Sequence, residues 1–337
     1  MKIDVVLPPD FPQRVPAAAR AAEALGFDGV WTNETQHDPF LPLTLVAEHT
    51  QRVNFGTAIA VSFARSPTTL AHTAWDLAAQ SGGRFILGLG TQVRAHIVRR
   101  FGMQWPESVA GLLREQIGAL RAIWNTWATG EPLNFRGEHL RLTLMTPFFT
   151  PPPMPHTEIP VFIAGVNEAL CHLAGEVADG FFVHPLHTVR YLREVLHPAL
   201  ALGRERAGRN ASQLQVVVTA LAHTSPEEKA FVRQQIAFYA STRSYRPVMA
   251  LHGWGEIADR LTRLAPRGAW AEMGELISDE IVSTFSVESA PEELGAALAE
   301  RYAGTADRLM LYLPFSPEGE SRFWSQLLSS VRGRLGG

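Results

Sequence analysis

The chain has 337 residues, of which 46% are hydrophobic and 19% charged, and its formal net charge at pH 7 is −3. This composition supports a sizeable core and excludes wholesale disorder, and the small net charge excludes a general attraction to nucleic acid or anionic membranes. The single cysteine, Cys171, excludes an intramolecular disulfide and fits a reducing cytoplasm.

The first ninety residues alternate between apolar strands and amphipathic helices. Asp4 interrupts the first apolar run, so the N-terminus does not resemble a signal peptide, and no apolar stretch is long enough for a membrane span. Strands that start roughly 25 to 32 residues apart suit βα units with right-handed crossovers. The predicted strands cover residues 3–7, 28–32, 53–61 and 85–89, and the predicted helices cover 12–25, 42–50 and 67–80.

The second half of the chain is less regular. It contains a long predicted helix at 105–127, strands at 160–164, 180–184, 214–222 and 307–313, and a final helix at 318–335. Residues 128–158 are rich in Pro, Thr and Gly, and residues 241–285 contain several short helical pieces, so we expect insertions after strands 4 and 7. Eight alternating strands favour an α/β fold, a closed (β/α)8 TIM barrel formed by residues 1–337 as a single domain. An open doubly wound sheet is the alternative.

Ligand sites of such barrels lie at the C-terminal ends of the strands. Strand 2 is followed by Glu34, His37 and Asp38, and two carboxylates with an imidazole could move protons. The competing interpretation is a polar loop whose aspartate caps a helix. The small residues 56–60 at the end of strand 3 allow the close approach of a flat ring, or tight packing between helix and strand.

Strand 4 carries two glycines, Gly88 and Gly90, which could bring the backbone near a ligand, and Thr91 and Gln92 follow them with hydrogen-bonding groups. Strand 5 runs through residues 165–167 directly into a helix. The free N–H groups there could bind an anion such as phosphate, or Asn167 could simply cap the helix.

Strand 6 ends in two histidines, His184 and His187, which could hold a metal. Strand 1 adds no ligand to them, so we expect no metal. Only two of the 30 basic residues are lysines, Lys2 and Lys229, and neither follows a strand into the expected site. Schiff-base catalysis is therefore excluded.

Four segments, in their order and spacing, resemble the luciferase-like monooxygenase superfamily, and most closely its F420-dependent oxidoreductases. The likeness covers about residues 3 to 330. The segments are GFDGVW at 26–31 followed by Glu34, GTAI at 56–59 leading to RSP at 65–67, RFILGLG at 84–90, and ADG at 178–180.

The resemblance implies a deazaflavin, coenzyme F420, that passes a hydride to or from a small substrate, in a cytoplasmic homodimer. A non-proline cis peptide after strand 3 maps to Ala58 and Ile59 and supports the ring. The other implied roles are ring or ribityl contacts for Thr91 and Gln92, phosphate binding for Gly165, Val166 and Asn167, cofactor binding for His184, and catalytic positions near the reactive edge for Glu34 and His37.

The sequence departs from the sugar-phosphate-oxidising members, which carry a glutamate proton donor after strand 4 where this chain has Gln92. His37 and Glu34 then remain as candidates for that role. The scarcity of lysine disfavours a phosphosugar, so we expect a neutral, fairly apolar substrate between Phe40, Phe63, Trp254 and the second insertion at 241–285. The alternatives are an FMN-dependent monooxygenase on the same barrel and a barrel that binds cofactor without turnover.

Overall fold

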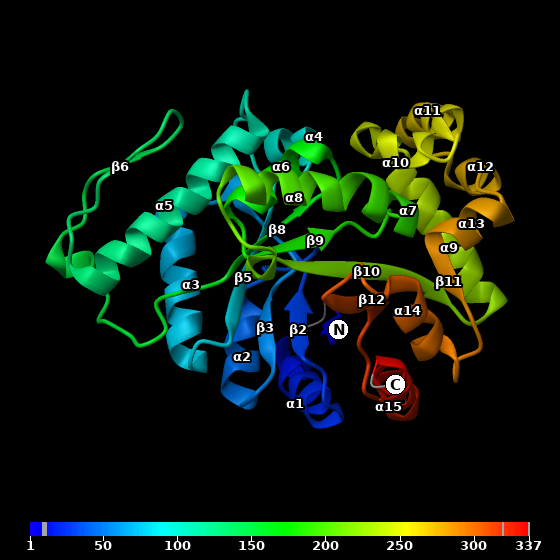
Figure 1. The fold of residues 1–337 in the computed structure, drawn as a ribbon, viewed down its shortest axis with the longest axis horizontal. Coiled ribbons are helices and arrows are strands. Elements are labelled where there is room, and N and C mark those ends of the chain that lie inside the picture. Colours follow the sequence, from blue (N-terminus) through cyan, green and yellow to red (C-terminus); the bar gives the residue numbers. More distant parts are fainter. Residues whose placement is uncertain (9–11, 319, 336–337) are drawn as a thin grey trace.

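Eight parallel strands form a closed ring in the computed structural model, which describes residues 1–8, 12–318 and 320–335 (Figure 1). The hydrogen-bonded ladder runs β1-β2-β3-β5-β8-β9-β10-β12 and returns to β1, with every pairing in the ring parallel. This closed ring is the predicted (β/α)8 barrel, so the open-sheet alternative is wrong. The ring strands are β1 (Lys2–Val6), β2 (Gly29–Thr32), β3 (Asn54–Thr57) with its continuation β4 (Ala60–Val61), β5 (Phe85–Gly90), β8 (Val161–Gly165), β9 (Gly180–Val183), β10 (Gln215–His223) and β12 (Arg308–Pro314).

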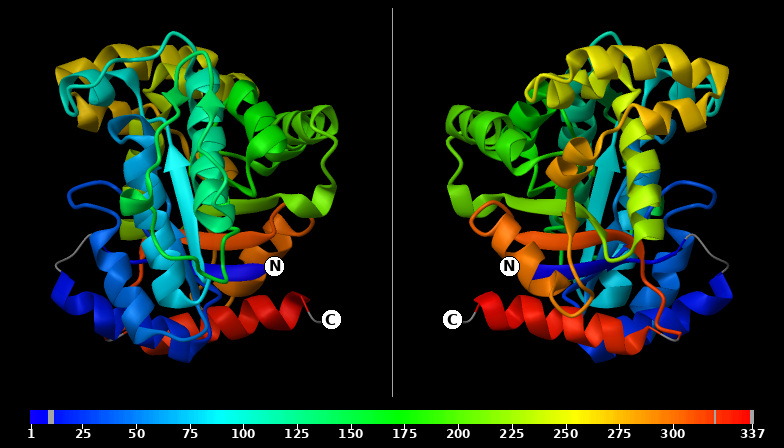
Figure 2. Two further views of the ribbon diagram at one scale, coloured as in Figure 1. Left: turned by 90° about the vertical axis from the view of Figure 1, so that its left-hand side faces the viewer. Right: turned by 90° about the vertical axis from the view of Figure 1, so that its right-hand side faces the viewer.

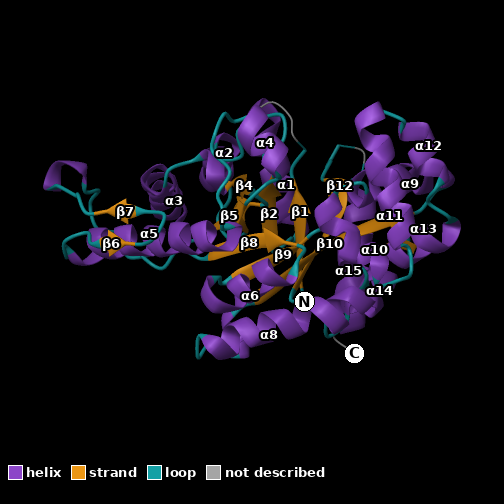
Figure 3. Cartoon of the chain, turned by 90° about the horizontal axis from the view of Figure 1, so that it is seen from above, coloured by secondary structure: helices purple, strands orange, loops and turns teal. Residues whose placement is uncertain are grey.

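Helices surround the ring, as the view from above shows (Figure 3). Among the described residues, none of these helices is long and apolar enough to cross a bilayer. The covering helices are α1 (Val15–Leu25), α2 (Leu41–His49), α3 (Pro67–Ser81), α5 (Val109–Thr129), α6 (Glu168–Val177), α7 (Val189–Tyr191) continuing into α8 (His197–Arg206), α14 (Leu294–Tyr302) and α15 (Ser321–Leu335).

The helix ends follow local sequence signals. Gly26 closes α1 in the left-handed conformation, with φ of 95°, and its N–H donates to the carbonyls of Ala22 and Glu23. Helix α5 begins at Val109 rather than at the predicted residue 105, because the Ser108 side chain accepts from the Gly111 N–H and sets the start there.

Two long segments interrupt the alternation. The first, between β5 and β8, adds α4 (Arg94–Arg99) and a hairpin of β6 (Phe135–Arg136) and β7 (Arg141–Leu142), which extends beside α5 away from the barrel (Figure 1). The second lies between β10 and β12, at the end of the barrel to which β5 points, whereas α15 lies at the other end (Figure 2). Its elements are α9 (Pro226–Ala240), α10 (Arg246–Ala250), α11 (Gly255–Leu264), α12 (Trp270–Glu275), α13 (Asp279–Phe285) and the unpredicted strand β11 (Ser286–Glu288), which pairs with β10.

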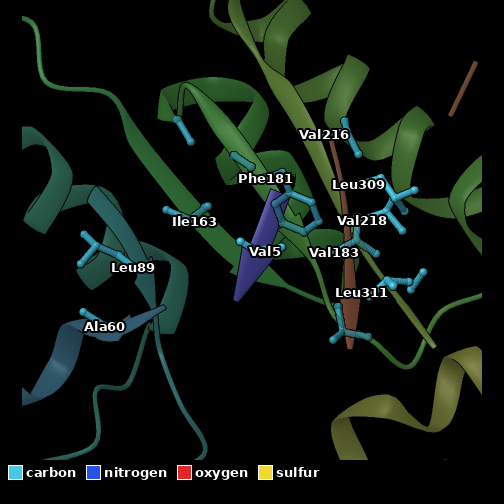
Figure 4. Packing of buried hydrophobic residues seen from close by; sticks show 14 of the residues in the cluster. Val5, Ala60, Leu89, Ile163, Phe181, Val183, Val216, Val218, Leu309 and Leu311 are labelled. Atoms are coloured by element: carbon cyan, nitrogen blue, oxygen red, sulfur yellow. The ribbon is translucent and has the colours of Figure 1, made fainter. Parts of the chain in front are cut away.

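Side chains alternate between two cores. Outward-pointing residues of the strands, such as Val5, Ile163 and Phe181, pack under the helices (Figure 4). Their neighbours in sequence point inward and fill the ring with a separate apolar layer, formed by Trp31, Ile86, Phe162, Phe182, Val217 and Met310. The barrel is therefore a packed core rather than a pore.

A buried ion pair joins the first and last strands of the ring. Arg308 donates through Nε and Nη2 to the two carboxylate oxygens of Asp4, over 2.7 and 2.8 Å, and Trp31 Nε1 donates to the same carboxylate over 2.9 Å. The two charged side chains are at most 1% exposed. A side chain at Gly29 would lie 2.5 Å from Asp4 Oδ1, so glycine makes room for the pair.

We predict that Asp4→Asn lowers the free energy of unfolding by about 3–5 kcal/mol, because it leaves the Arg308 guanidinium buried without its counter-charge. Urea denaturation followed by circular dichroism measures this loss.

Glu194→Gln serves as the control, since it removes one partner of the Arg190–Glu194 pair, whose side chains are both about half exposed. We expect that change to cost less than about 1 kcal/mol. Equal losses of unfolding free energy in the two variants would show that the buried Asp4–Arg308 pair stabilises the fold no more than an exposed pair does.

Candidate active site

A cavity of about 450 Å³ opens at the C-terminal ends of the strands. This size is in the range of small-molecule and cofactor sites. Its floor is continuous with the apolar layer inside the barrel, because Phe182 and Met310 belong to both. Among the predicted site residues, those that line the cavity are Glu34, His37, Ala58, Ile59, Gln92 and His184.

The third strand breaks into β3 and β4 at the Ala58–Ile59 peptide, which is cis although neither residue is proline. The cis peptide implied by the resemblance is thus confirmed. Backbone bonds hold the break on the side of β2: Ala58 N–H donates to the Thr32 carbonyl over 2.8 Å, and Glu34 N–H donates to the Ile59 carbonyl over 3.3 Å. Both residues of the peptide face the cavity.

The glycines of β5 fit against this break. A Cβ on Gly88 would lie 1.7 Å from the Thr57 carbonyl oxygen, and a Cβ on Gly90 would lie 2.5 Å from Ile59 Cδ1. Thr57 Oγ1 also donates to the Gly88 carbonyl over 2.6 Å. These glycines therefore make room for the neighbouring strand, and their close approach to a ligand stays a prediction.

Glu34 ties the end of β2 to the segment after β4. Its Oε2 accepts from the Val61 N–H and from Arg65 Nη1, each over 2.6 Å, and its side chain is 6% exposed. Arg65 also reaches Asp38, and Asp38 Oδ1 accepts from the Phe40 N–H over 2.8 Å at the start of α2. Asp38 Oδ1 also accepts from the Leu41 N–H over 3.2 Å, so Asp38 binds backbone N–H groups at the start of α2, although Phe40 is the N-cap residue. The proposed catalytic role of Glu34 stays a prediction.

Gln92 reaches the cavity from the end of β5, with its backbone in the left-handed region at φ 57°. Its Oε1 accepts from the Val93 N–H over 3.0 Å. Thr91 is not among the described residues that line the cavity; its hydroxyl donates to the Gln92 carbonyl over 3.3 Å. Cofactor contacts from Thr91 and Gln92 remain predictions.

The segment after β8 lies outside the lining, although Ala164 directly before it is part of the lining. The Asn167 side chain caps α6 by accepting from the Leu170 N–H over 3.0 Å. A Cβ on Gly165 would lie 2.7 Å from Leu170 Cβ, so this glycine serves the packing of strand against helix. The carbonyl of Val166 accepts from the Tyr191 hydroxyl over 3.0 Å. The capping alternative is thus present, and phosphate binding remains a prediction.

His184 enters the cavity from the end of β9 and packs between two tyrosine rings, with centroids 4.6 Å from Tyr239 and 4.3 Å from Tyr245. Burial, and secondarily the nearby His187, lowers the pKa of His184 to about 3. Its Nδ1 accepts from the Leu186 N–H over 3.1 Å, so the neutral ring carries its proton on Nε2.

His187 is turned into the protein. Its Nδ1 bonds the His184 carbonyl over 2.8 Å and its Nε2 bonds the Tyr302 hydroxyl over 3.1 Å, so both ring nitrogens have partners within the chain. Burial lowers the pKa of His187 to about 4.

The expected apolar wall is wrong. Phe40, Phe63 and Trp254 are not among the described residues that line the cavity, and Trp254 instead stacks on His252 within the second insertion. The wall contains Phe231 and Tyr239 of α9 and Tyr312 of β12. Tyr312 could have been found by examining the end of the eighth strand, but no signal in the sequence marks a residue in the middle of a helix such as Tyr239.

Comparison with known proteins agrees with this geometry. Residues 1–308 match the family model of the luciferase-like monooxygenases. A Mycobacterium tuberculosis protein described as uncharacterised is 46% identical, covering 92% of each chain, and a putative coenzyme F420-dependent oxidoreductase of the same species is 31% identical over 80% of this chain and 82% of its own. The solved coenzyme F420-dependent tetrahydromethanopterin reductase from Methanopyrus kandleri shares the fold, with a TM-score of 0.79, 19% identity and 98% coverage of both chains.

We predict that His184 stays neutral, with its proton on Nε2, down to about pH 4, because its pKa is about 3. Long-range ¹H–¹⁵N NMR spectra of the imidazole report both the tautomer and the titration. Since unfolded histidines bind protons below about pH 6.5 and the buried ones do not, the free energy of unfolding should fall as the pH drops below 6.5. A His184 signal that titrates near pH 6.5 would contradict this description of the site.

Proposed function

Because the chain belongs to the luciferase-like monooxygenase family, we propose that it is an F420-dependent oxidoreductase that transfers a hydride between the deazaflavin and a small, neutral organic substrate. The observation that carries the proposal is the cavity of about 450 Å³ at the C-terminal strand ends, which Ala58 and Ile59 line with an apolar surface and Gln92 and His184 line with polar groups. The similarity to a putative coenzyme F420-dependent oxidoreductase of Mycobacterium tuberculosis supports it further.

The cavity combines an apolar surface with polar groups, as a flat ring with a polar edge requires. Ala58 and Ile59 supply an apolar surface against which one face of the ring would rest. Gln92 and His184 supply polar groups at the rim, and the neutral His184 ring offers an N–H donor at Nε2. When bound, the deazaflavin supplies a carbon that takes up or releases a hydride.

The phosphate of the cofactor would lie beyond the rim, at the start of α6. The first N–H groups of a helix have no partners within the helix and favour negative charge. Asn167 already occupies the Leu170 N–H, so the binding groups there would be the backbone of residues 165–167 and the remaining N–H groups of the first turn. Thr91, next to Gln92, would contact the chain between ring and phosphate.

His37 is the better placed of the two predicted proton carriers. It is exposed and lines the cavity, whereas the Glu34 side chain is only 6% exposed. Glu34 would then hold the loop that presents His37 rather than exchange protons with a substrate.

The direct test of the proposal is cofactor binding. We expect the purified protein to quench the fluorescence of F420 in a saturable titration, and to bind FMN far more weakly under the same conditions. Preferential binding of FMN would replace the proposal with the flavin-dependent alternative, and tight F420 binding without turnover of any enone, ketone or alcohol would favour a barrel that binds cofactor without catalysis.

We predict that His37→Ala lowers kcat by about 10²-fold or more, the usual contribution of a general acid or base, and leaves F420 affinity nearly unchanged. The readouts are F420 absorbance during turnover and F420 fluorescence during titration.

His156→Ala is the matched control. His156 is also exposed but lies beside Gly83, at the N-terminal end of β5 and therefore at the opposite end of the barrel. Its removal should change neither readout. If the two variants behave alike, the placement of the reactive edge near His37 is wrong.

A further inference from the structure

Two tyrosine hydroxyls meet in the wall of the cavity. Tyr239 lies on α9 and Tyr312 on β12, and both side chains line the cavity. Their oxygens are 2.5 Å apart, and Tyr312 Oη donates to Gln235 Oε1 over 3.1 Å. The three groups form a hydrogen-bonded chain that runs from α9 through β12 back to α9.

The protons of this chain can be arranged in two ways. A tyrosine hydroxyl has one proton to donate and also accepts, whereas an amide oxygen only accepts. When Tyr312 donates to Gln235, Tyr239 donates to Tyr312 and its proton is used within the chain. When an acceptor enters the cavity, Tyr239 can turn its O–H toward it, and Tyr312 can donate to Tyr239 in return. The pair can therefore offer one donor to a ligand while the two hydroxyls stay hydrogen-bonded to each other.

The residues around the two tyrosines favour a neutral ligand. Burial raises the pKa of both Tyr239 and Tyr312, so the hydroxyls keep their protons at neutral pH. His184, whose ring packs on Tyr239, is uncharged at that pH. Among the described residues that line the cavity, Glu34 and Asp38 are acidic and none is a lysine or arginine. An anionic substrate would gain no counter-charge here.

We propose that the Tyr239–Tyr312 hydroxyl pair is the oxygen-binding subsite of the cavity, which takes the carbonyl or hydroxyl oxygen of a neutral, largely apolar ketone or alcohol. Phe231 and Leu313 line the same cavity and supply apolar surface for the carbon skeleton. This assignment rests on the proposed function, because it treats the cavity as the place where the substrate of the oxidoreductase binds. The binding itself can be measured with and without cofactor.

The test compares ketones with analogues in which a methylene group replaces the oxygen. The probe pairs are cyclohexanone and methylenecyclohexane, acetophenone and α-methylstyrene, and 2-octanone and 2-methyl-1-octene. Affinities are measured by saturation-transfer NMR on the full-length protein, alone and saturated with F420. Because a hydrogen bond contributes about 0.5–1.5 kcal/mol net, the unmodified protein should prefer at least one ketone by about two- to twelvefold.

Tyr239→Phe should reduce that preference to near unity, since it removes only the hydroxyl that meets the ligand. Tyr312→Phe should reduce it by a smaller factor, since Tyr239 then loses the partner that donates to it. Tyr245→Phe is the matched control: its ring also packs on His184, but it is not among the described residues that line the cavity. That variant should keep the full preference.

Two results would overturn the subsite: no preference for any ketone in the unmodified protein, or an unchanged preference in both Tyr239→Phe and Tyr312→Phe. Circular dichroism of each variant establishes that the fold is retained. Failure of F420 to bind would overturn the proposed function separately, because the ketone preference is also measured without cofactor.

Discussion

The Asp4 carboxylate joins three strands of the ring, because it lies on the first and accepts hydrogen bonds from its two neighbours, and the rest of the barrel depends on this arrangement. It lies on β1, its guanidinium partner Arg308 opens β12, and Trp31 reaches it from β2. A charge that is buried away from water is tolerated only when it is paired and hydrogen-bonded. The pair fixes the seam where the first and last strands meet, and Trp31 extends from it into the aromatic layer with Phe182. The apolar layer fills the interior beside this pair, and the cavity opens beyond that layer at the C-terminal strand ends.

The apolar packing inside the ring ends, on the side of the cavity, at the break between β3 and β4. Thr57 and Gly88 exchange two hydrogen bonds, since the threonine hydroxyl donates to the Gly88 carbonyl and accepts from the Gly88 N–H over 3.0 Å. Gly88 and Gly90 can approach the third strand closely because they lack side chains. Ala58 and Ile59 are thus held against both neighbouring strands, which gives the cavity a floor of fixed shape.

Periodicity and composition were sufficient to predict the eight ring strands, the helix ends at Gly26 and Ser66–Pro67, and the two irregular segments. They could not predict β11 or α4, because three- and six-residue elements carry little periodic signal of their own. The cis peptide followed only from the resemblance, since no local property of Ala58 or Ile59 indicates it. The apolar wall was misplaced because Trp254 finds partners in His252 and Phe285 within its own insertion, and a sequence does not show which face of an insertion turns inward.

The two sides of the cavity differ in how the fold holds them. The floor belongs to the ring strands, and Ala58 and Ile59 are held there by backbone bonds to Thr32 and Glu34, so its shape follows from barrel geometry. Part of the wall comes from α9, which belongs to the segment between β10 and β12 and is not part of the ring. The rigid floor suits a cofactor that must bind in one orientation. The wall suits the selection of one substrate among several. On this division, the proposed cofactor would rest on Ala58 and Ile59, and Phe231 and Tyr239 would select the proposed substrate.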